Sequence, residues 1–196
     1  MNCSLRLCAL PLLLVIVGCS SKAPEETSVY LLRSAVEAIG HDDTDSQLRV
    51  GISDVTLAEY LTAEGVVLQL ADHRIHHARY HLWAEPLQHS VKTVLAAELS
   101  AILGMSVQTR SPASSWDQRI DVYVDQLHGT SDGQIKVVAW WNVSNSSDGA
   151  SLAGEIQLQV DLPGSGYDAL VAAHRQVLAE LAAKMASTVQ QAMDAT

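Results

Sequence analysis

The sequence predicts an α+β fold of two layers, in which two long amphipathic helices cover one face of an antiparallel sheet. Three segments, at residues 120–125, 135–143 and 156–162, alternate apolar and polar side chains. This alternation is typical of antiparallel strands with one buried and one solvated face. Two further segments, residues 84–103 and 167–193, repeat apolar side chains at helical spacing, and this repeat predicts the helices.

The first half of the chain is expected to supply shorter strands. Each is a short apolar or alternating run, and turn-forming residues at Gly65 and at Asp72–His73 separate some of them. A single helical turn is expected at residues 57–61, between the second and third strands. The expected strands are residues 29–32, 47–55, 66–70, 74–77 and 105–109.

The ends of several elements carry recognisable signals. In the first helix, Pro86 suits the initial turn and Gly104 suits the termination. In the second helix, Ser165 and Asp168 stand at the spacing of a capping box. The tripeptide Ser-Asp-Gly at residues 131–133 predicts a hairpin turn between two of the long strands.

The N-terminus has the features of a lipoprotein signal. An apolar run at residues 7–17 is too short to span a bilayer, which takes about 20 apolar residues, and it suits the apolar region of a secretory signal. The run ends in Gly18 and Cys19, which resembles the lipobox of bacterial lipoproteins, where a peptidase cuts before a cysteine that carries the lipid. We expect a signal peptide at residues 1–18, lipid attachment at Cys19, a lipidated tether at residues 19–28 and a periplasmic domain at residues 29–196.

The residue after the cysteine bears on the destination of the protein. It is Ser20, whereas an aspartate at this place usually retains a Gram-negative lipoprotein in the inner membrane. The resemblance to lipoproteins therefore implies a lipid anchor in the outer membrane, with the domain facing the periplasm. The alternative is an ordinary signal peptide with a chance cysteine, but such a signal has small residues at both positions that flank its cleavage site.

Composition excludes several functions. The chain has 196 residues and a formal net charge of −10, which argues against binding of nucleic acid or of anionic lipid through a basic patch. Its cysteines are Cys3, Cys8 and Cys19, so a domain that begins after the signal has no disulfide and no cysteine nucleophile. No second segment approaches the length of a membrane span.

Four groups of residues together resemble a known family over nearly the whole mature chain. They are the sequence YLL at residues 30–32, residues 55–61 followed by Gly-Val-Val at 65–67, the sequence LWAEPL at residues 82–87, and residues 133–140 combined with the start of the last helix. The resemblance is to the ABC-type transport auxiliary lipoproteins, the family of the paraquat-inducible protein C (PqiC) type. One departure is Ala58, which stands where the family often has proline.

This resemblance implies a role in transport between membranes. Members of the family are outer-membrane lipoproteins that dock the periplasmic component of an MCE-type lipid transport system, whose transporter lies in the inner membrane, and that support envelope integrity. They form homo-oligomers and are not enzymes. The implied partners are therefore an MCE protein, its inner-membrane transporter and further copies of this chain, without a cofactor, a metal or nucleic acid.

Four side chains are candidates for contact with a partner or a second subunit. Tyr60 and Leu61 are apolar residues in a connection, where binding residues are often found. Trp83 is expected in the core, with an interface contact as the alternative. Trp140 and Trp141 point to opposite faces of one strand, so one of them is available for a contact when the other is buried.

A histidine-rich segment supports an alternative function. His73, His76, His77 and His81 lie within nine residues and are potential ligands of zinc or copper. A periplasmic metal-binding or hydrolytic lipoprotein would use this segment. The opposing interpretation is a solvated strand edge, because the segment shows strand and turn character and lacks the spacing of a known metal motif.

Overall fold

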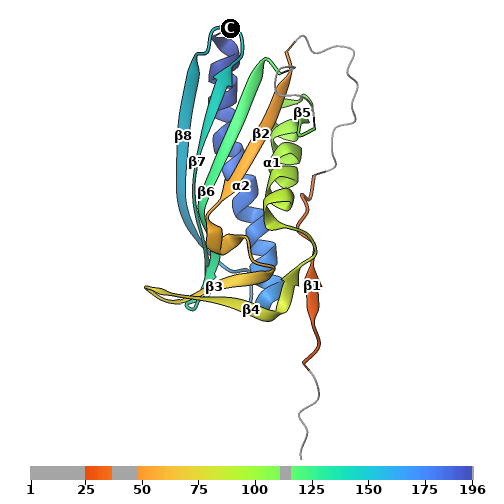
Figure 1. Cartoon of the computed structure of the whole chain (residues 1–196), viewed down its shortest axis with the longest axis vertical. Coiled ribbons are helices and arrows are strands. Elements are labelled where there is room, and N and C mark those ends of the chain that lie inside the picture. Colours follow the sequence, from red (N-terminus) through yellow and green to blue (C-terminus); the bar gives the residue numbers. More distant parts are fainter. Residues whose placement is uncertain (1–24, 37–47, 111–115, 196) are drawn as a thin grey trace, which may run out of the picture.

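The computed structural model describes residues 25–36, 48–110 and 116–195, and within them the α+β class is confirmed (Figure 1). One eight-stranded sheet is joined by a 3-10 turn and two α-helices. The elements are β1 Ser28–Tyr30, β2 Val50–Leu57, η1 Glu59–Leu61, β3 Gly65–Ala71, β4 Arg74–Trp83, α1 Leu87–Leu103, β5 Val107–Gln108, β6 Gln118–Thr130, β7 Gln134–Asn145, β8 Ser151–Asp161 and α2 Gly166–Asp194.

The sheet is mixed, which corrects the expectation of a purely antiparallel sheet. Strands β6, β7 and β8 pair antiparallel, as do β3 and β4. Strand β6 runs parallel to both β2 and β3, and the short strands β1 and β5 also pair parallel. The hairpin β3–β4 and helix α1 separate β2 from β6, and such a long connection is what parallel pairing requires. Side-chain alternation does not reveal strand direction.

Strand β6 organises the sheet. On one side it pairs with β7 along almost its whole length. On the other side, β2 pairs with its first half, from Gln118 to Val124, and β3 pairs with its end, at Gly129 and Thr130. The turn η1 occupies the joint between β2 and β3. The sheet therefore branches, with β5 beyond β2 and with β4 and β1 beyond β3.

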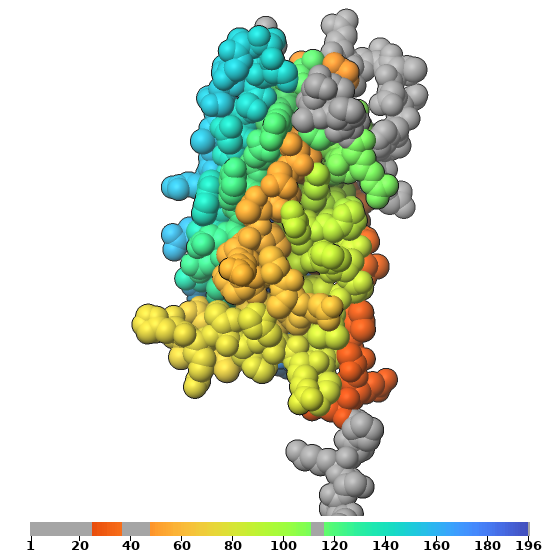
Figure 2. All heavy atoms as spheres, in the orientation of Figure 1, coloured from red at the N-terminus to blue at the C-terminus, as the bar shows by residue number. Residues whose placement is uncertain are grey.

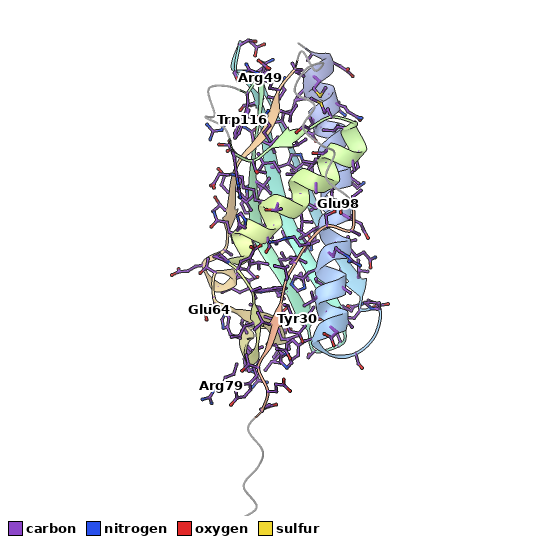
Figure 3. The ribbon with its side chains drawn as sticks, turned by 90° about the vertical axis from the view of Figure 1, so that its right-hand side faces the viewer. Tyr30, Arg49, Glu64, Arg79, Glu98 and Trp116 are labelled. Carbon is purple, nitrogen blue, oxygen red and sulfur yellow. The ribbon has the colours of Figure 1, made fainter. Side chains whose placement is uncertain are left out.

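Both helices lie on one face of the sheet, as expected. Helix α2 packs against β6, β7 and β8, while α1 packs against β2 and against α2, and Figure 3 shows the two helices side by side on that face. The alternating strand residues meet them in one hydrophobic core. Its largest fully buried members are Leu32, Ile52, Leu61, Leu95, Leu99, Ile120, Leu127, Ile135, Leu170, Leu178, Leu181 and Met185.

The ends of the helices partly follow the sequence signals. Helix α1 begins at Leu87, directly after Pro86, and ends at Gly104, whose φ of 66° is the left-handed conformation that glycine adopts readily. Ser165 is the N-cap residue of α2, but its side chain makes no capping hydrogen bond, so the expected capping box is not formed. None of the helices in the described parts of the chain is long and apolar enough to cross a membrane.

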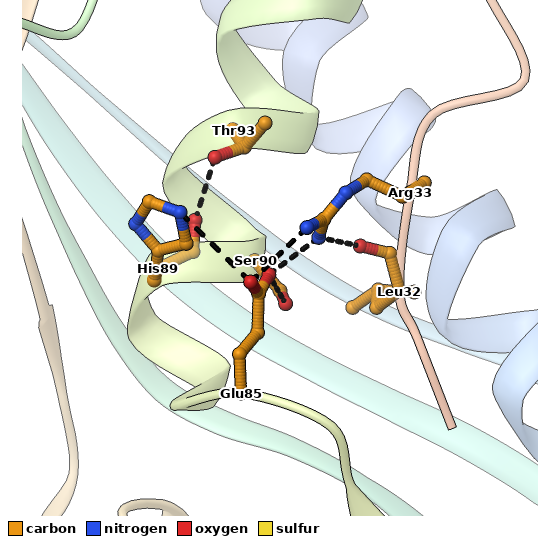
Figure 4. A network of polar contacts seen from close by, with 6 residues as sticks. All are labelled: Leu32, Arg33, Glu85, His89, Ser90 and Thr93. Carbon is orange, nitrogen blue, oxygen red and sulfur yellow. Dashed lines mark hydrogen bonds and ion pairs between the residues drawn. The ribbon is translucent and has the colours of Figure 1, made fainter. Parts of the chain in front are cut away.

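The segment after β1 is attached to the start of α1 (Figure 4). The Arg33 guanidinium donates two hydrogen bonds to the Glu85 carboxylate, one of them from Nη2 to Oε2 at 3.0 Å. Ser90 donates a third, from Oγ to Oε1 at 2.6 Å. These donors lower the pKa of Glu85 to about 2, Arg33 contributing most. The carboxylate therefore stays charged and connects the N-terminal segment to the helix.

Candidate docking surface

The face of the sheet opposite the helices carries an exposed aromatic pair. Trp140 on β7 is 46% exposed and Tyr123 on β6 is 40% exposed. The two residues are cross-strand partners, and their rings stack with centroids 5.8 Å apart and an interplanar angle of 13°. The neighbouring Trp141 points to the other face and is only 3% exposed. The predicted division of the two tryptophans between the faces is therefore confirmed.

Acidic side chains surround this aromatic pair. The pair lies in a row across four strands, with Thr56 of β2 beside Tyr123 and Glu155 of β8 beside Trp140. The next rows on the same face add Asp54 and Asp121, and Asp125 lies at the bulge of β6. The basic residues among these rows are Arg119, which pairs with Asp121 at 3.0 Å, and Lys136. We call Tyr123, Trp140 and this acidic border the sheet-face patch.

The sheet-face patch has the chemistry of a protein contact. Large rigid aromatic side chains supply much of the binding energy at protein interfaces, at a small cost in conformational entropy. The carboxylates at the border favour a partner with basic side chains at the corresponding positions. The pair was only half anticipated, because the sequence pointed to Trp140 but gave no reason to single out Tyr123.

The turn η1 places Tyr60 and Leu61 differently from the expectation. Leu61 has 0% exposure and belongs to the core, so its side chain is not on the surface where a partner contact was predicted. Tyr60 is half-buried, with its hydroxyl directed to interior partners. The apolar character of this turn reflects its position at the branch of the sheet, where a side chain is needed to fill the joint between β2 and β3.

Tyr60 takes part in a hydrogen-bond network across the joint. Its hydroxyl lies 2.8 Å from His128 Nδ1 and 3.1 Å from the carbonyl oxygen of Asp125. His128 Nε2 lies 3.2 Å from Oε1 of Gln69, whose amide nitrogen donates to the carbonyl of Asp72. This orientation makes His128 Nε2 the donor to Gln69 and Nδ1 an acceptor, so the Tyr60 hydroxyl shares its one proton between Nδ1 and the carbonyl oxygen of Asp125. Burial lowers the pKa of His128 and raises the pKa of Tyr60 to about 12, which keeps both neutral.

Replacing Tyr60 with phenylalanine is expected to lower the free energy of unfolding by about 1 to 2 kcal/mol, because it leaves the buried Nδ1 of His128 without its donor. Urea unfolding of the two proteins measures the difference. A double variant with His128→Leu is the control, since the loss from Tyr60→Phe should shrink when the imidazole is already absent. Equal losses in both backgrounds would contradict a direct hydrogen bond.

Trp83 lies in the core, as the first of its two interpretations held. It is 7% exposed, and its ring meets His174 of α2 edge-on with centroids 5.2 Å apart. The alternative was a partner contact through Trp83, and the side chain is too deeply buried in the folded chain to make one. The LWAEPL sequence thus has a structural explanation: Trp83 anchors β4 to α2, Glu85 holds Arg33, and Pro86 precedes the first turn of α1.

The histidines of β4 do not converge on a common point. His77 Nε2 donates to the carbonyl oxygen of Tyr60 at 2.8 Å. His81 instead lies 3.1 Å from the Tyr30 hydroxyl and stacks on Tyr167 of α2 at 3.7 Å between centroids. Across residues 25–36, 48–110 and 116–195, no group of three or more potential ligands is arranged to hold a metal ion. The geometry therefore gives no support to the metal-binding alternative.

Tyr30 and His81 also fix the N-terminal segment. Figure 3 shows Tyr30 at the end of the molecule where α2 begins. Its strand β1 pairs with the end of β4, so the chain leaves the domain from this end. Cys19, the predicted lipid attachment site, lies outside the described residues, and its modification stays a prediction.

Comparison with known proteins agrees with the arrangement of these elements. A family model described as ABC-type transport auxiliary lipoprotein component matches residues 30–186. The chain is 29% identical over 177 residues to the intermembrane transport lipoprotein PqiC of Escherichia coli strain K12, covering 89% of this chain and 92% of that protein. The PqiC of Shigella flexneri matches with the same values.

Solved structures show the same fold. A crystal structure of an uncharacterized protein superposes with a TM-score of 0.71 at 26% identity, covering 84% of this chain and 99% of the other. A crystal structure of a protein from Xanthomonas campestris superposes with a TM-score of 0.66 at 12% identity, covering 85% and 99%. The fold is therefore shared with experimentally determined proteins.

Proposed function

Since the chain belongs to the ABC-type transport auxiliary lipoprotein family, we propose that it is the outer-membrane subunit of an MCE-type intermembrane lipid transport system. In this proposal, lipid on Cys19 holds the domain at the outer membrane, facing the periplasm. The domain then docks the periplasmic MCE component, which works with a transporter in the inner membrane. The single observation that carries the proposal is the family match over residues 30–186.

Two further observations support this role. The curated relatives are named intermembrane transport lipoproteins, and they align with 89% of this chain. The lipobox-like sequence at residues 16–19 is the predicted attachment site of the lipid anchor that a docking subunit needs. The matching family and the curated relatives are described by transport and not by a reaction, so the proposed function is non-catalytic.

The sheet-face patch is the proposed site of docking. It is the place where exposed aromatic side chains stack on the face that the helices leave open. Its carboxylates select a partner segment with basic side chains. The family resemblance also implies homo-oligomers. When the subunits associate through other surfaces, the sheet-face patch stays available for docking.

Site-specific photo-crosslinking in cells tests the docking role. Benzoylphenylalanine replaces Trp140 in the full-length lipoprotein, and a second protein carries it at Leu152, an exposed residue of β8 at the far end of the sheet. We expect an adduct with the MCE component from position 140 and none from position 152. If position 140 gives only adducts with further copies of this chain, or no adduct, the assignment of docking to this patch is wrong.

A further inference from the structure

We propose that the end of the domain from which the anchor leaves contacts the bilayer directly, and that an apolar groove there takes an acyl chain of a membrane phospholipid. The inference deepens the proposed function, because it relies on a lipid at Cys19. Several connections meet at this end: the β3–β4 turn, the β6–β7 turn and the loop that precedes α2 (Figure 1).

Backbone contacts hold these connections together. Ser131 donates its backbone N–H to the carbonyl of Gln69 at 3.0 Å, joining the β6–β7 turn to β3. Leu162 donates to the carbonyl of Gly133 at 2.9 Å, joining the loop before α2 to the same turn. The stack of His81 on Tyr167 then links α2 to the strand β4 beside β1. The end is thus one continuous surface.

The length of the tether restricts how far this end lies from the membrane. Glu25, the first described residue, stands six residues after Cys19. Six residues span at most about 20 Å when fully extended. A lipid at Cys19 therefore holds Glu25, three residues before β1, within about 20 Å of the bilayer surface, whereas the opposite end of the sheet lies much farther along the long axis of the molecule.

An apolar groove opens at this end. It has a volume of about 310 Å³, and leucines from β3, from α2 and from the loop that precedes α2 line it together with Tyr167. Leu170 at its base is 1% exposed, while Leu70 at its rim is 39% exposed. Glycines also line the groove, and a Cβ added at Gly133 or Gly166 would have no neighbouring atom within 4 Å, so both glycines border open space. The leucines of the lining are Leu68, Leu70, Leu162 and Leu170.

Two other exposed apolar side chains lie at the same end of the domain, on strand faces that point away from the groove. Ile75 of β4, the strand partner of Gln69, is 37% exposed, and Val29 of β1, the partner of Leu82, is 61% exposed. Figure 2 shows the hairpin β3–β4 projecting sideways from the body of the molecule at the same end. A single exposed apolar residue needs no explanation, but an open apolar groove at the same end as two further exposed apolar side chains marks this end as an interaction surface. Beside a membrane, hydrocarbon is the apolar partner at hand, and each buried methylene contributes about 0.8 kcal/mol.

Crosslinking to a photoactivatable lipid tests this inference. The lipidated full-length protein is reconstituted in phosphatidylethanolamine and phosphatidylglycerol vesicles that contain a phospholipid with a diazirine in its acyl chain. After illumination, mass spectrometry locates the labelled peptides and the intact mass reports acylation of Cys19. We expect label on the peptides that contain Leu68, Leu70 and Leu162–Leu170, in addition to any label on the tether.

Two matched variants make the result specific. Leu70→Asp places a carboxylate at the rim and should reduce the groove label at least about fivefold, because a charge is costly beside hydrocarbon. Leu152→Asp changes a leucine of similar exposure, 37%, near the β7–β8 turn at the opposite end, and should leave the label unchanged. Both positions are exposed, so both proteins should fold, which circular dichroism verifies.

Three outcomes would overturn the inference while leaving the proposed function intact. Each applies to protein in which Cys19 is acylated. The first is label restricted to the tether, and the second is equal groove label in the wild type and in Leu70→Asp. The third is a groove occupied by a second copy of the chain. An unmodified Cys19 would instead contradict the proposed anchoring itself. Acylation and groove labelling are read from the same sample, so the two failures are distinguishable.

Discussion

Replacing Trp140 with alanine is expected to weaken binding of the periplasmic MCE component at least about thirtyfold, which corresponds to about 2 kcal/mol. The indole is 46% exposed and stacks on Tyr123, so it presents a rigid apolar surface before any partner arrives. Its removal also leaves Tyr123 without its stacking partner. Titration of the MCE component onto the immobilised lipoprotein measures the change in affinity.

The control for this prediction is Leu152→Ala. Leu152 is an exposed apolar residue of the same sheet, but it lies near the β7–β8 turn, away from the sheet-face patch. Its replacement should leave the affinity unchanged. If Trp140→Ala remains folded and binds the MCE component as tightly as the wild type does, docking does not use this patch.

Lowering the pH from 7 to 4 is expected to reduce the free energy of unfolding by about 3 kcal/mol through His174 alone. This side chain is 1% exposed, and its Nδ1 donates to the carbonyl of Leu170 at 2.8 Å. Burial lowers the pKa of His174 to about 4, from an ordinary value of 6.5. The unfolded chain therefore takes up a proton near pH 6.5, whereas the folded chain does not until about pH 4.

This difference between the folded and unfolded pKa of His174 decides whether stability rises or falls with pH. The contribution of neutral His174 is fully present above pH 6.5 and is lost as the pH falls toward 4. Burial also lowers the pKa of His128, which adds in the same direction. Glu85 acts in a separate range, because its pKa of about 2 removes stability only below about pH 4.5, and its exposure weakens the effect.

Urea unfolding at pH 7.5, 6.0, 5.0 and 4.0 measures this dependence. The matched variant is His174→Leu, which keeps a side chain of similar size in the core without a titratable group. Its stability should change much less between pH 7.5 and 5.0 than that of the wild type, whatever its absolute value. Parallel curves for the two proteins would show that His174 is not responsible.

The sequence patterns predicted where the strands and helices lie better than they predicted which strands pair and in which direction. Alternation and helical spacing are local properties, so the long strands and both helices were expected near their observed positions. Gly104 and Pro86 also marked the ends of α1, because their backbone restrictions act within one turn. Strand direction depends on which distant segments pair, and the parallel pairing of β2 with β6 was therefore missed.

A β-bulge explains why Tyr123 was overlooked. Pairing of β6 with β7 shifts by one residue between Val124 and Gln126, leaving Asp125 as the extra residue. Without this shift, the turn at residues 131–133 would set Val124, an inward-facing residue, opposite Trp140. Because of the bulge, apolar side chains of β6 and β7 pair on the inward face both before and after Asp125, and Tyr123 lies opposite Trp140 on the outward face. A bulge has no clear sequence signal of its own.

The other candidate residues show a limit of apolar character as a guide to binding. Leu61 and Trp83 are as apolar as Trp140, but both are buried. Their burial depends on the branch of the sheet at η1 and on the contact of β4 with α2, neither of which is visible in a single segment of sequence. The histidines likewise share a segment, although β4 distributes His77 and His81 to different partners.

The intact mass of the protein, purified from native outer membranes, tests the central claim most directly. We predict a polypeptide that begins at Cys19 and carries acyl chains on that residue, with residues 1–18 removed. A polypeptide that retains residues 1–18, or one whose Cys19 is unmodified, would contradict it.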